Sequence, residues 1–177
     1  MTLRFVCLAL LAEESASGYD ICRRIRASDL RYYVNGAQAT VYAMLKQLER
    51  GGELQSERHK TPGRPDRIVF HITPAGRSLV RVDAIDPDAE GAIPILMRFS
   101  AQLPCAQLHS VAVRQLAAAR SILDDEAERA VPGTADAPLA AWLDDARLSY
   151  CRFRVDALTD LVSLLAGAER STESRRS

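Results

Sequence analysis

The stretch Gly36–Arg77 constrains the fold more than any other part of this 177-residue chain. It begins with a helical pattern in which apolar residues recur at i, i+3, i+4 and i+7, the spacing of one face of an α-helix. Gly51-Gly52 ends that pattern, because glycine adopts the left-handed cap conformation at little cost. Two short extended runs follow, Leu54–Arg58 and Arg67–Ile72, with a loop rich in Pro and Gly between them. The stretch therefore predicts a helix followed by a β-hairpin. The apolar residues of the helix are Val41, Met44, Leu45 and Leu48.

Two further helical patterns precede this stretch. Thr2 can cap a helix that extends to Ala12, and Ser17 can cap a second one over the sequence GYDICRRIRA. Three helices followed by a β-hairpin is the order of a winged helix-turn-helix, whose last helix enters the major groove of duplex DNA. Outward arginines on the second helix suit phosphates, although a solvated face explains each of them equally well: Arg23, Arg24 and Arg26.

The start of the third helix carries the side chains that would read DNA. Gln38 can pair with adenine, and Thr40 can offer its methyl group to a thymine methyl. Tyr42 is expected to reach the sugar-phosphate backbone, with packing against a neighbouring helix as the alternative. Lys46 follows one turn later and would meet a phosphate.

The loop of the hairpin is basic. Lys60 and Arg64 lie in it, and Arg67 begins the second strand. Arginine is favoured beside the minor groove and the phosphates, so these three residues are predicted to contact DNA through the wing. After the second strand, Thr73 and Pro74 predict the cap and first residue of another helix, which is expected to run to Ile85.

Charge is divided unevenly along the chain. The whole chain has a formal net charge of zero. Residues 1–85 contain 13 Lys and Arg against 9 Asp and Glu, a net charge of +4, and residues 86–177 therefore carry −4. The basic half is the one with the DNA-binding pattern, as phosphate contact requires, although many domains with a charge of +4 bind no nucleic acid.

These motifs resemble the PadR family of transcriptional regulators. The resemblance covers residues 3 to about 85 and is carried by SGYDI, ATVYAMLKQLERGG and GRPDRIVFHITPAGR. Glu53 departs from it, standing where the family usually has an apolar residue, and Val69-Phe70 replaces a more usual tyrosine pair. The resemblance implies DNA binding with repression as the default mode, and in some family members binding of phenolic acids or flat hydrophobic drugs at a dimer interface.

The second half of the chain is predicted to be helical. Gln107–Ala130 and Pro138–Ala168 read as two long helices joined by a loop. The second carries apolar residues at alternating spacings of three and four, which is typical of coiled-coil packing. This region resembles the C-terminal helices of regulators of the AphA kind, and we expect it to form a homodimer, with an intramolecular three-helix bundle as the alternative. The apolar residues are Leu143, Ala146, Tyr150, Phe153, Ala157, Leu161 and Leu164.

Four aromatic residues are candidates for an effector pocket or for the core of the dimer interface. They are Phe99, Trp142, Tyr150 and Phe153. The interface core is the favoured interpretation, and the ligand that would occupy a pocket is expected to be a small aromatic or hydrophobic molecule.

The sequence gives no sign of a metal site, a cofactor or an enzyme. Cys7, Cys22, Cys105 and Cys151 form no CxxC pair and have no His at ligand spacing, so buried free thiols are favoured over a redox switch. No phosphate loop, GxSxG elbow or HExxH motif occurs. The chain lacks a signal peptide and an apolar run long enough to span a bilayer, which predicts a cytoplasmic protein.

Together these patterns predict a mostly α-helical protein with a small β-hairpin wing. Residues 1–85 would form a winged helix-turn-helix, residues 86–170 a helical dimerisation or effector domain, and residues 171–177 a disordered tail. The expected function is a repressor that binds a pseudo-palindromic operator as a homodimer and is released by an effector. A winged helix that binds another protein and no DNA is the alternative.

Overall fold

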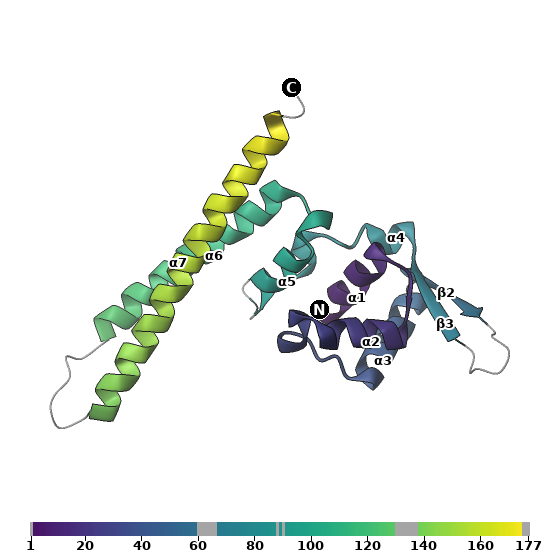
Figure 1. The fold of residues 1–177 in the computed structure, drawn as a ribbon, viewed down its shortest axis with the longest axis horizontal. Helices are drawn as coiled ribbons and strands as arrows, with labels where there is room; N and C mark the ends of the chain where they lie inside the picture. The colour runs from purple at the N-terminus through teal and green to yellow at the C-terminus, as the bar shows by residue number, and fades with distance from the viewer. Residues whose placement is uncertain (1, 60–66, 88, 90, 130–137, 175–177) are drawn as a thin grey trace. The chain divides into compact units, whose positions relative to one another are not determined.

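A computed structural model describes residues 2–59, 67–87, 89, 91–129 and 138–174. The chain divides into two compact units, Met1–Leu103 and Pro104–Ser177. The first unit holds all of the strands and the shorter helices, and the second consists of two long helices (Figure 1). The fold is therefore mostly helical with one small sheet, as expected.

Three helices form the core of the first unit: α1 (Thr2–Glu13), α2 (Gly18–Ala27) and α3 (Gln38–Arg50). A short 3-10 helix, η1 (Asp29–Tyr32), connects α2 to α3. Ser17 caps α2 through a capping box with Asp20, as its sequence predicts. The face of α3 chosen from its periodicity is buried, apart from the half-buried Met44; its fully buried members are Val41, Leu45 and Leu48.

The sheet has three antiparallel strands in the order β1-β3-β2. The hairpin strands β2 (Leu54–His59) and β3 (Arg67–Ile72) follow the prediction closely. The third strand, β1 (Ala16–Ser17), was not predicted, because two residues show no alternation of apolar and polar side chains. β1 pairs with Val69 and Phe70 and thereby ties the start of α2 to the base of the wing.

The helix predicted after the hairpin is shorter than expected. α4 (Pro74–Arg77) has the predicted Thr73 cap but comprises one turn, and a 3-10 turn, η2 (Val82–Ala84), follows. Val82 and Ile85 are both buried, a spacing of three that a 3-10 turn places on one side.

The first unit extends beyond residue 85, where the sequence placed its end. α5 (Ala92–Arg98) and the 3-10 turn η3 (Ser100–Gln102) are also part of it. Phe99 packs edge to face on Phe5 of α1, with ring centroids 5.7 Å apart, and Gln102 donates a hydrogen bond to the Ala9 carbonyl. These contacts agree with the end of the first compact unit at Leu103.

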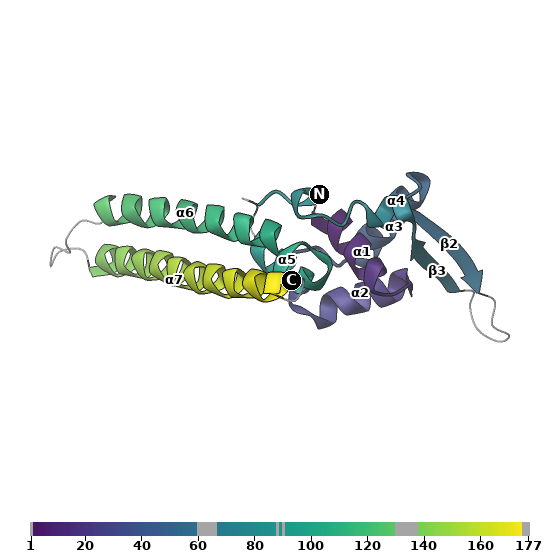
Figure 2. The ribbon, with the colours of Figure 1, turned by 90° about the horizontal axis from the view of Figure 1, so that it is seen from above.

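The second unit is an antiparallel pair of helices, α6 (Cys105–Arg129) and α7 (Pro138–Ser174), which lie side by side in Figures 1 and 2. His109 pairs with Glu169 at 3.6 Å near one end, and Glu126 pairs with Arg147 at 3.6 Å nearer the other. α7 continues to Ser174, so the predicted tail is helical over 171–174, whereas residues 175–177 lie outside the described part of the chain. The loop predicted over 131–138 falls almost entirely outside it as well.

The face of α7 that meets α6 is not the face chosen from the sequence. Cys151, Leu158 and Leu165, spaced by seven residues, are buried. On α6, Leu108 and Val111 are buried, whereas Ala118 and Ile122 are exposed. In a single chain the predicted stripe on α7 is instead largely exposed, and its most exposed members are Leu143, Tyr150, Phe153 and Leu164.

All four cysteines are free thiols. Cys7, Cys22 and Cys151 are buried, as the favoured interpretation predicts, whereas Cys105 is half-buried. Burial, with a smaller contribution from the neighbouring Cys22, raises the pKa of the Cys7 thiol to about 12. Burial also raises the pKa of Cys22 and that of Cys105, where Glu169 adds to the effect. The Cys7 thiol is therefore held in its unreactive protonated form.

Neither a membrane span nor a metal cluster is found in the part of the chain that the structure describes. None of its helices combines the length and the apolarity needed to cross a bilayer. No group of three or more His, Cys, Asp and Glu side chains within the described ranges is placed to hold a metal ion.

Candidate nucleic-acid interface

The start of α3 presents a polar surface next to a firmly packed core. The Asn35 side chain accepts a hydrogen bond from the Ala37 N–H at 3.0 Å and so shapes the turn into the helix. Gln38, Thr40 and Lys46 are all exposed, while the opposite face of the helix is buried against the rest of the unit. Three of the four residues predicted to contact DNA from this helix are thus exposed, and the helix that carries them is fixed in place.

Tyr42 packs against a neighbouring helix, which is one of the two roles that its sequence left open. Its ring is half-buried and lies over Gly18, where an added Cβ would come within 2.6 Å of the ring carbon Cζ. The glycine at the start of α2 therefore makes room for the ring, which packs between the two helices. Gly18 is the glycine of SGYDI, one of the motifs that resemble the PadR family. The contact with the Tyr42 ring explains why a residue without a side chain is needed at this position.

The three arginines of α2 differ from one another. Arg24 is tied to the end of α1, since it donates to the Leu10 carbonyl at 3.2 Å and pairs with Glu13 at 2.5 Å. Arg24 therefore stabilises the junction of the two helices, and the prediction that it faces outward is wrong. Arg23 and Arg26 are exposed as predicted, and they flank a shallow surface pocket together with Tyr19, an exposed aromatic residue that the sequence reading passed over.

The basic side chains of the wing are only partly described. Lys60 and Arg64 lie outside the described residues. Arg67 is largely exposed at the start of β3, where its guanidinium donates to the Asp20 carboxylate of α2. The hydrogen bonds from Ser17 and the adjacent Arg67 guanidinium lower the pKa of Asp20, so the carboxylate is charged and the two groups form an ion pair. Arg67 thus has a partner within the chain, which the sequence did not suggest.

Glu53, a departure from the family pattern, also has a structural role. Its carboxylate is mostly buried and pairs with Arg4 of α1 at 2.6 Å. A charged side chain is accommodated at this position because an arginine from the first helix neutralises it. The change therefore leaves the base of the wing attached to α1 by an ion pair in place of an apolar contact.

This geometry agrees with comparison against known proteins. Residues 7–82 match the family model described as the transcriptional regulator PadR-like family. The N-terminal domain belongs to the PadR-like family. The match spans α1 to η2, and thus includes every described residue that the sequence assigned to DNA contact.

Relatives of the PadR-like domain include a curated protein of Mycobacterium tuberculosis, "Probable transcriptional regulator Rv1176c". It is 30% identical over 78 residues, which are 44% of this chain and 41% of that protein. The chain thus matches well under half the length of this curated relative.

Similar solved structures cover most of the chain at low identity. Bacillus subtilis PadR in complex with operator DNA is 17% identical, with a TM-score of 0.45, over 93% of this chain and 99% of that one. The same protein with p-coumaric acid is 18% identical, with a TM-score of 0.39, over 93% and 96%. The protein smu.1604c of Streptococcus mutans UA159 is 17% identical, with a TM-score of 0.42, over 94% and 98%.

The four aromatic residues proposed as a pocket or an interface do not form one set. Trp142, Tyr150 and Phe153 are 62–68% exposed along α7. Phe99 is 1% exposed and packs on Phe5 in the core of the first unit. Phe99 is therefore a core residue and offers no surface to a ligand, because α5 and η3 fold onto α1 instead of joining the C-terminal helices.

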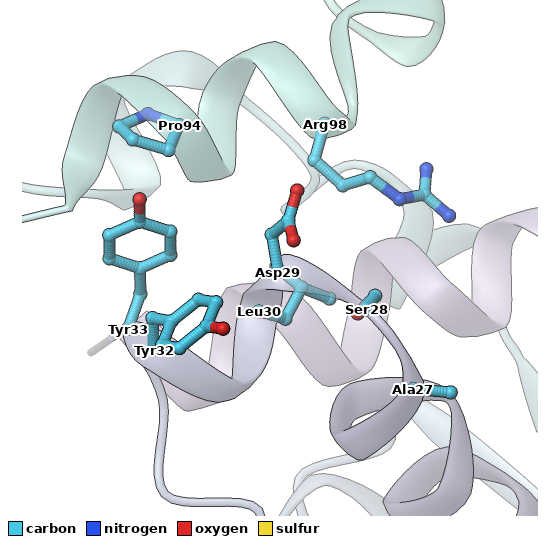
Figure 3. Close-up of a pocket in the computed structure, with 8 residues that line it drawn as sticks. All are labelled: Ala27, Ser28, Asp29, Leu30, Tyr32, Tyr33, Pro94 and Arg98. Carbon is cyan, nitrogen blue, oxygen red and sulfur yellow. The ribbon is translucent and has the colours of Figure 1, made fainter.

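A separate pocket of about 620 Å³ lies within the first unit, between η1 and α5 (Figure 3). The Tyr33 ring stands in it with its hydroxyl toward Pro94, and the ring fits closely against Gly91, whose φ is +77°. Arg98 lines the rim but is paired with Glu13 at 3.0 Å. Sequence reasoning missed this pocket because two segments about sixty residues apart build it. Its remaining lining residues are Ala27, Ser28, Asp29, Leu30 and Tyr32.

Proposed function

We propose that this protein is a transcriptional regulator that binds duplex DNA through its PadR-like domain. One observation carries the proposal: the N-terminal turns of α3 expose a polar surface on a helix whose other face is locked into a winged helix-turn-helix. In this fold that part of the helix is the part that enters the major groove.

The proposed contacts divide into base reading and backbone binding. Gln38 and Thr40 would meet base edges, because both are exposed in the first turn of α3. Tyr42, held over Gly18, would direct its hydroxyl to the sugar-phosphate backbone. Lys46 would bind phosphate from α3, and three wing residues would do so from the hairpin: Lys60, Arg64 and Arg67.

We propose further that the protein acts as a homodimer that binds a pseudo-palindromic operator. The support is the apolar stripe of α7, which α6 leaves uncovered and which includes exposed Tyr150, Phe153 and Leu164. Burying one such side chain gains about 1.5–3 kcal/mol, so burial of several on each of two chains favours a dimer. Two PadR-like domains would then bind two half-sites about 34 Å apart.

Repression and release by an effector complete the proposal. A dimer bound over a promoter blocks access to it, which makes repression the default outcome. Trp142, Tyr150 and Phe153 on α7 present flat rings that suit a small aromatic or hydrophobic effector. Such a ligand would compete for the same surface that we assign to the dimer.

The test is a quantitative DNA-binding titration with the DNA upstream of the protein's own coding region. Gln38→Ala and Tyr42→Ala should each weaken binding by about threefold to thirtyfold, the range for one or two lost contacts. Arg120→Ala, which removes an exposed arginine of α6, is the matched control and should bind like the wild type. Wild-type protein that is folded but binds neither this DNA nor a random pool would favour the alternative, a winged helix that binds another protein.

A further inference from the structure

Three hydrogen-bond donors converge on a single carboxylate oxygen at the start of α2. Oδ2 of Asp20 accepts from the Ser17 N–H at 3.2 Å, from the Ser17 hydroxyl at 2.5 Å and from the Arg67 guanidinium. The Asp20 side chain is 18% exposed, whereas that of Arg67 is 59% exposed. The carboxylate is thus held firmly from the protein side, and it holds the more exposed guanidinium in turn.

The position of this ion pair links the two parts of the domain that would touch DNA. Arg67 is the first residue of β3, at the point where the chain returns from the wing. Ser17 belongs to β1, which pairs with Val69 two residues further along β3. Asp20 lies in the first turn of α2, the helix that packs against α3. The pair therefore joins the loop end of the wing strands to the helix-turn-helix at one junction.

The Asp20 carboxylate carries a negative charge, which is unfavourable on a surface that binds DNA. A negative charge beside a predicted phosphate contact repels DNA, so its removal should strengthen binding. A carboxylate that orients Arg67 has the opposite effect, because an arginine released from its partner loses the fixed direction that a phosphate contact needs. The two effects predict opposite changes in affinity, and measurement can separate them.

We propose that Asp20 is a positioning residue for DNA binding, which holds the Arg67 guanidinium and the start of β3 in the orientation that meets the DNA backbone. This inference rests on the DNA-binding function proposed above. Asp20 itself makes no contact with DNA; it acts through Arg67.

Asp20→Asn is the decisive variant, because the amide keeps an acceptor for the Ser17 N–H and removes the charge. We expect it to weaken DNA binding by about threefold to tenfold, the usual size of one charge-assisted contact. Arg67→Ala should weaken binding to a similar degree, and the double variant should bind no more weakly than Arg67→Ala alone. Asp20→Glu, which restores the carboxylate, should recover most of the affinity.

Two matched variants separate positioning from charge and from helix capping. Asp29→Asn removes an exposed carboxylate of η1 that has no part in this junction, and should leave affinity unchanged or slightly raised. Ser17→Ala removes the side-chain cap of α2 but leaves the carboxylate beside Arg67. It should lower the melting temperature while affecting DNA affinity less than Asp20→Asn does.

The outcomes are distinct. Equal or tighter binding by Asp20→Asn, additive losses in the double variant, or an equal loss of affinity in Ser17→Ala would each overturn the positioning role. A folded wild type that fails to bind DNA would instead refute the proposed function, and the positioning role with it. The ion pair can also be tested in the absence of DNA, by measuring the pKa of Asp20 with carboxyl NMR. Arg67→Ala should raise this pKa. An unchanged pKa would show that the two side chains do not pair in solution.

Discussion

Replacement of Gly18 by alanine tests whether the placement of Tyr42 matters for DNA binding. The added Cβ would lie 2.6, 2.8 and 3.0 Å from three atoms of the Tyr42 ring, which is closer than carbon atoms approach one another. Overpacking of this kind costs about 1–3 kcal/mol if the ring stays. Removing a glycine from the unfolded chain offsets about 0.4–1 kcal/mol of that cost.

Tyr42 is half-buried, so its ring can swing outward and relieve the contact. We therefore expect Gly18→Ala to lose at most about 2 kcal/mol of unfolding free energy by chemical denaturation. Its DNA affinity should fall about threefold to tenfold, because the hydroxyl leaves the position from which we propose that it reaches the DNA backbone. Tyr42→Phe, which removes the hydroxyl alone, should show a similar loss of affinity at wild-type stability.

Gly167→Ala provides the control, since nothing lies within 4 Å of the added Cβ and the residue is inside α7. It should raise stability by up to about 1 kcal/mol and leave DNA affinity unchanged. If Gly18→Ala folds normally, moves the ring and still binds DNA like the wild type, then Tyr42 is a packing residue and our contact assignment for it is wrong.

Three further predictions concern other parts of the molecule. Phe153→Asp should convert a dimer of 19.5-kDa chains into a monomer in light scattering, while Ser163→Asp, outside the stripe, should not; a dimeric Phe153→Asp variant would place the interface elsewhere. The lowered pKa of Asp20 adds stability that is present above about pH 4 and lost as the pH falls below it, so Asp20→Asn should flatten the acid end of the stability curve, and an unchanged curve would contradict the ion pair. Native protein at pH 8 should react with a thiol reagent at Cys105 well before Cys7, whose pKa is raised to about 12, and equal rates would contradict the burial of Cys7.

Local signals account for most of what the sequence predicted correctly. The caps at Ser17 and Thr73, the periodicity of α3 and the alternation of the hairpin each involve neighbouring residues, and the structure follows them closely. The left-handed glycine after α3 is Gly52, with φ of +80°, as the glycine pair implied.

The errors arose where distant segments meet. β1 is too short to show a pattern, and the contact of Phe99 with Phe5 joins residues from opposite ends of the first unit. Arg24 looked solvated on its own helix, but its partner belongs to α1. The predicted contact residues Gln38, Thr40 and Lys46 are exposed, as that role requires. The ion pair of Arg67 with Asp20 could not be predicted from the sequence, because the two residues are brought together only by the fold.

The dependence of DNA affinity on salt concentration tests the central claim most directly. Lys46 and the three basic wing residues would place up to four cations on each half-site, or eight in the dimer. For B-DNA the slope of log K against log salt is about −0.9 per neutralised phosphate, so we predict a slope between about −4 and −7. It should be measured on the upstream DNA with wild-type protein between low and physiological salt. A slope close to zero, or no binding at low salt, would contradict the account of this protein as a DNA-binding regulator.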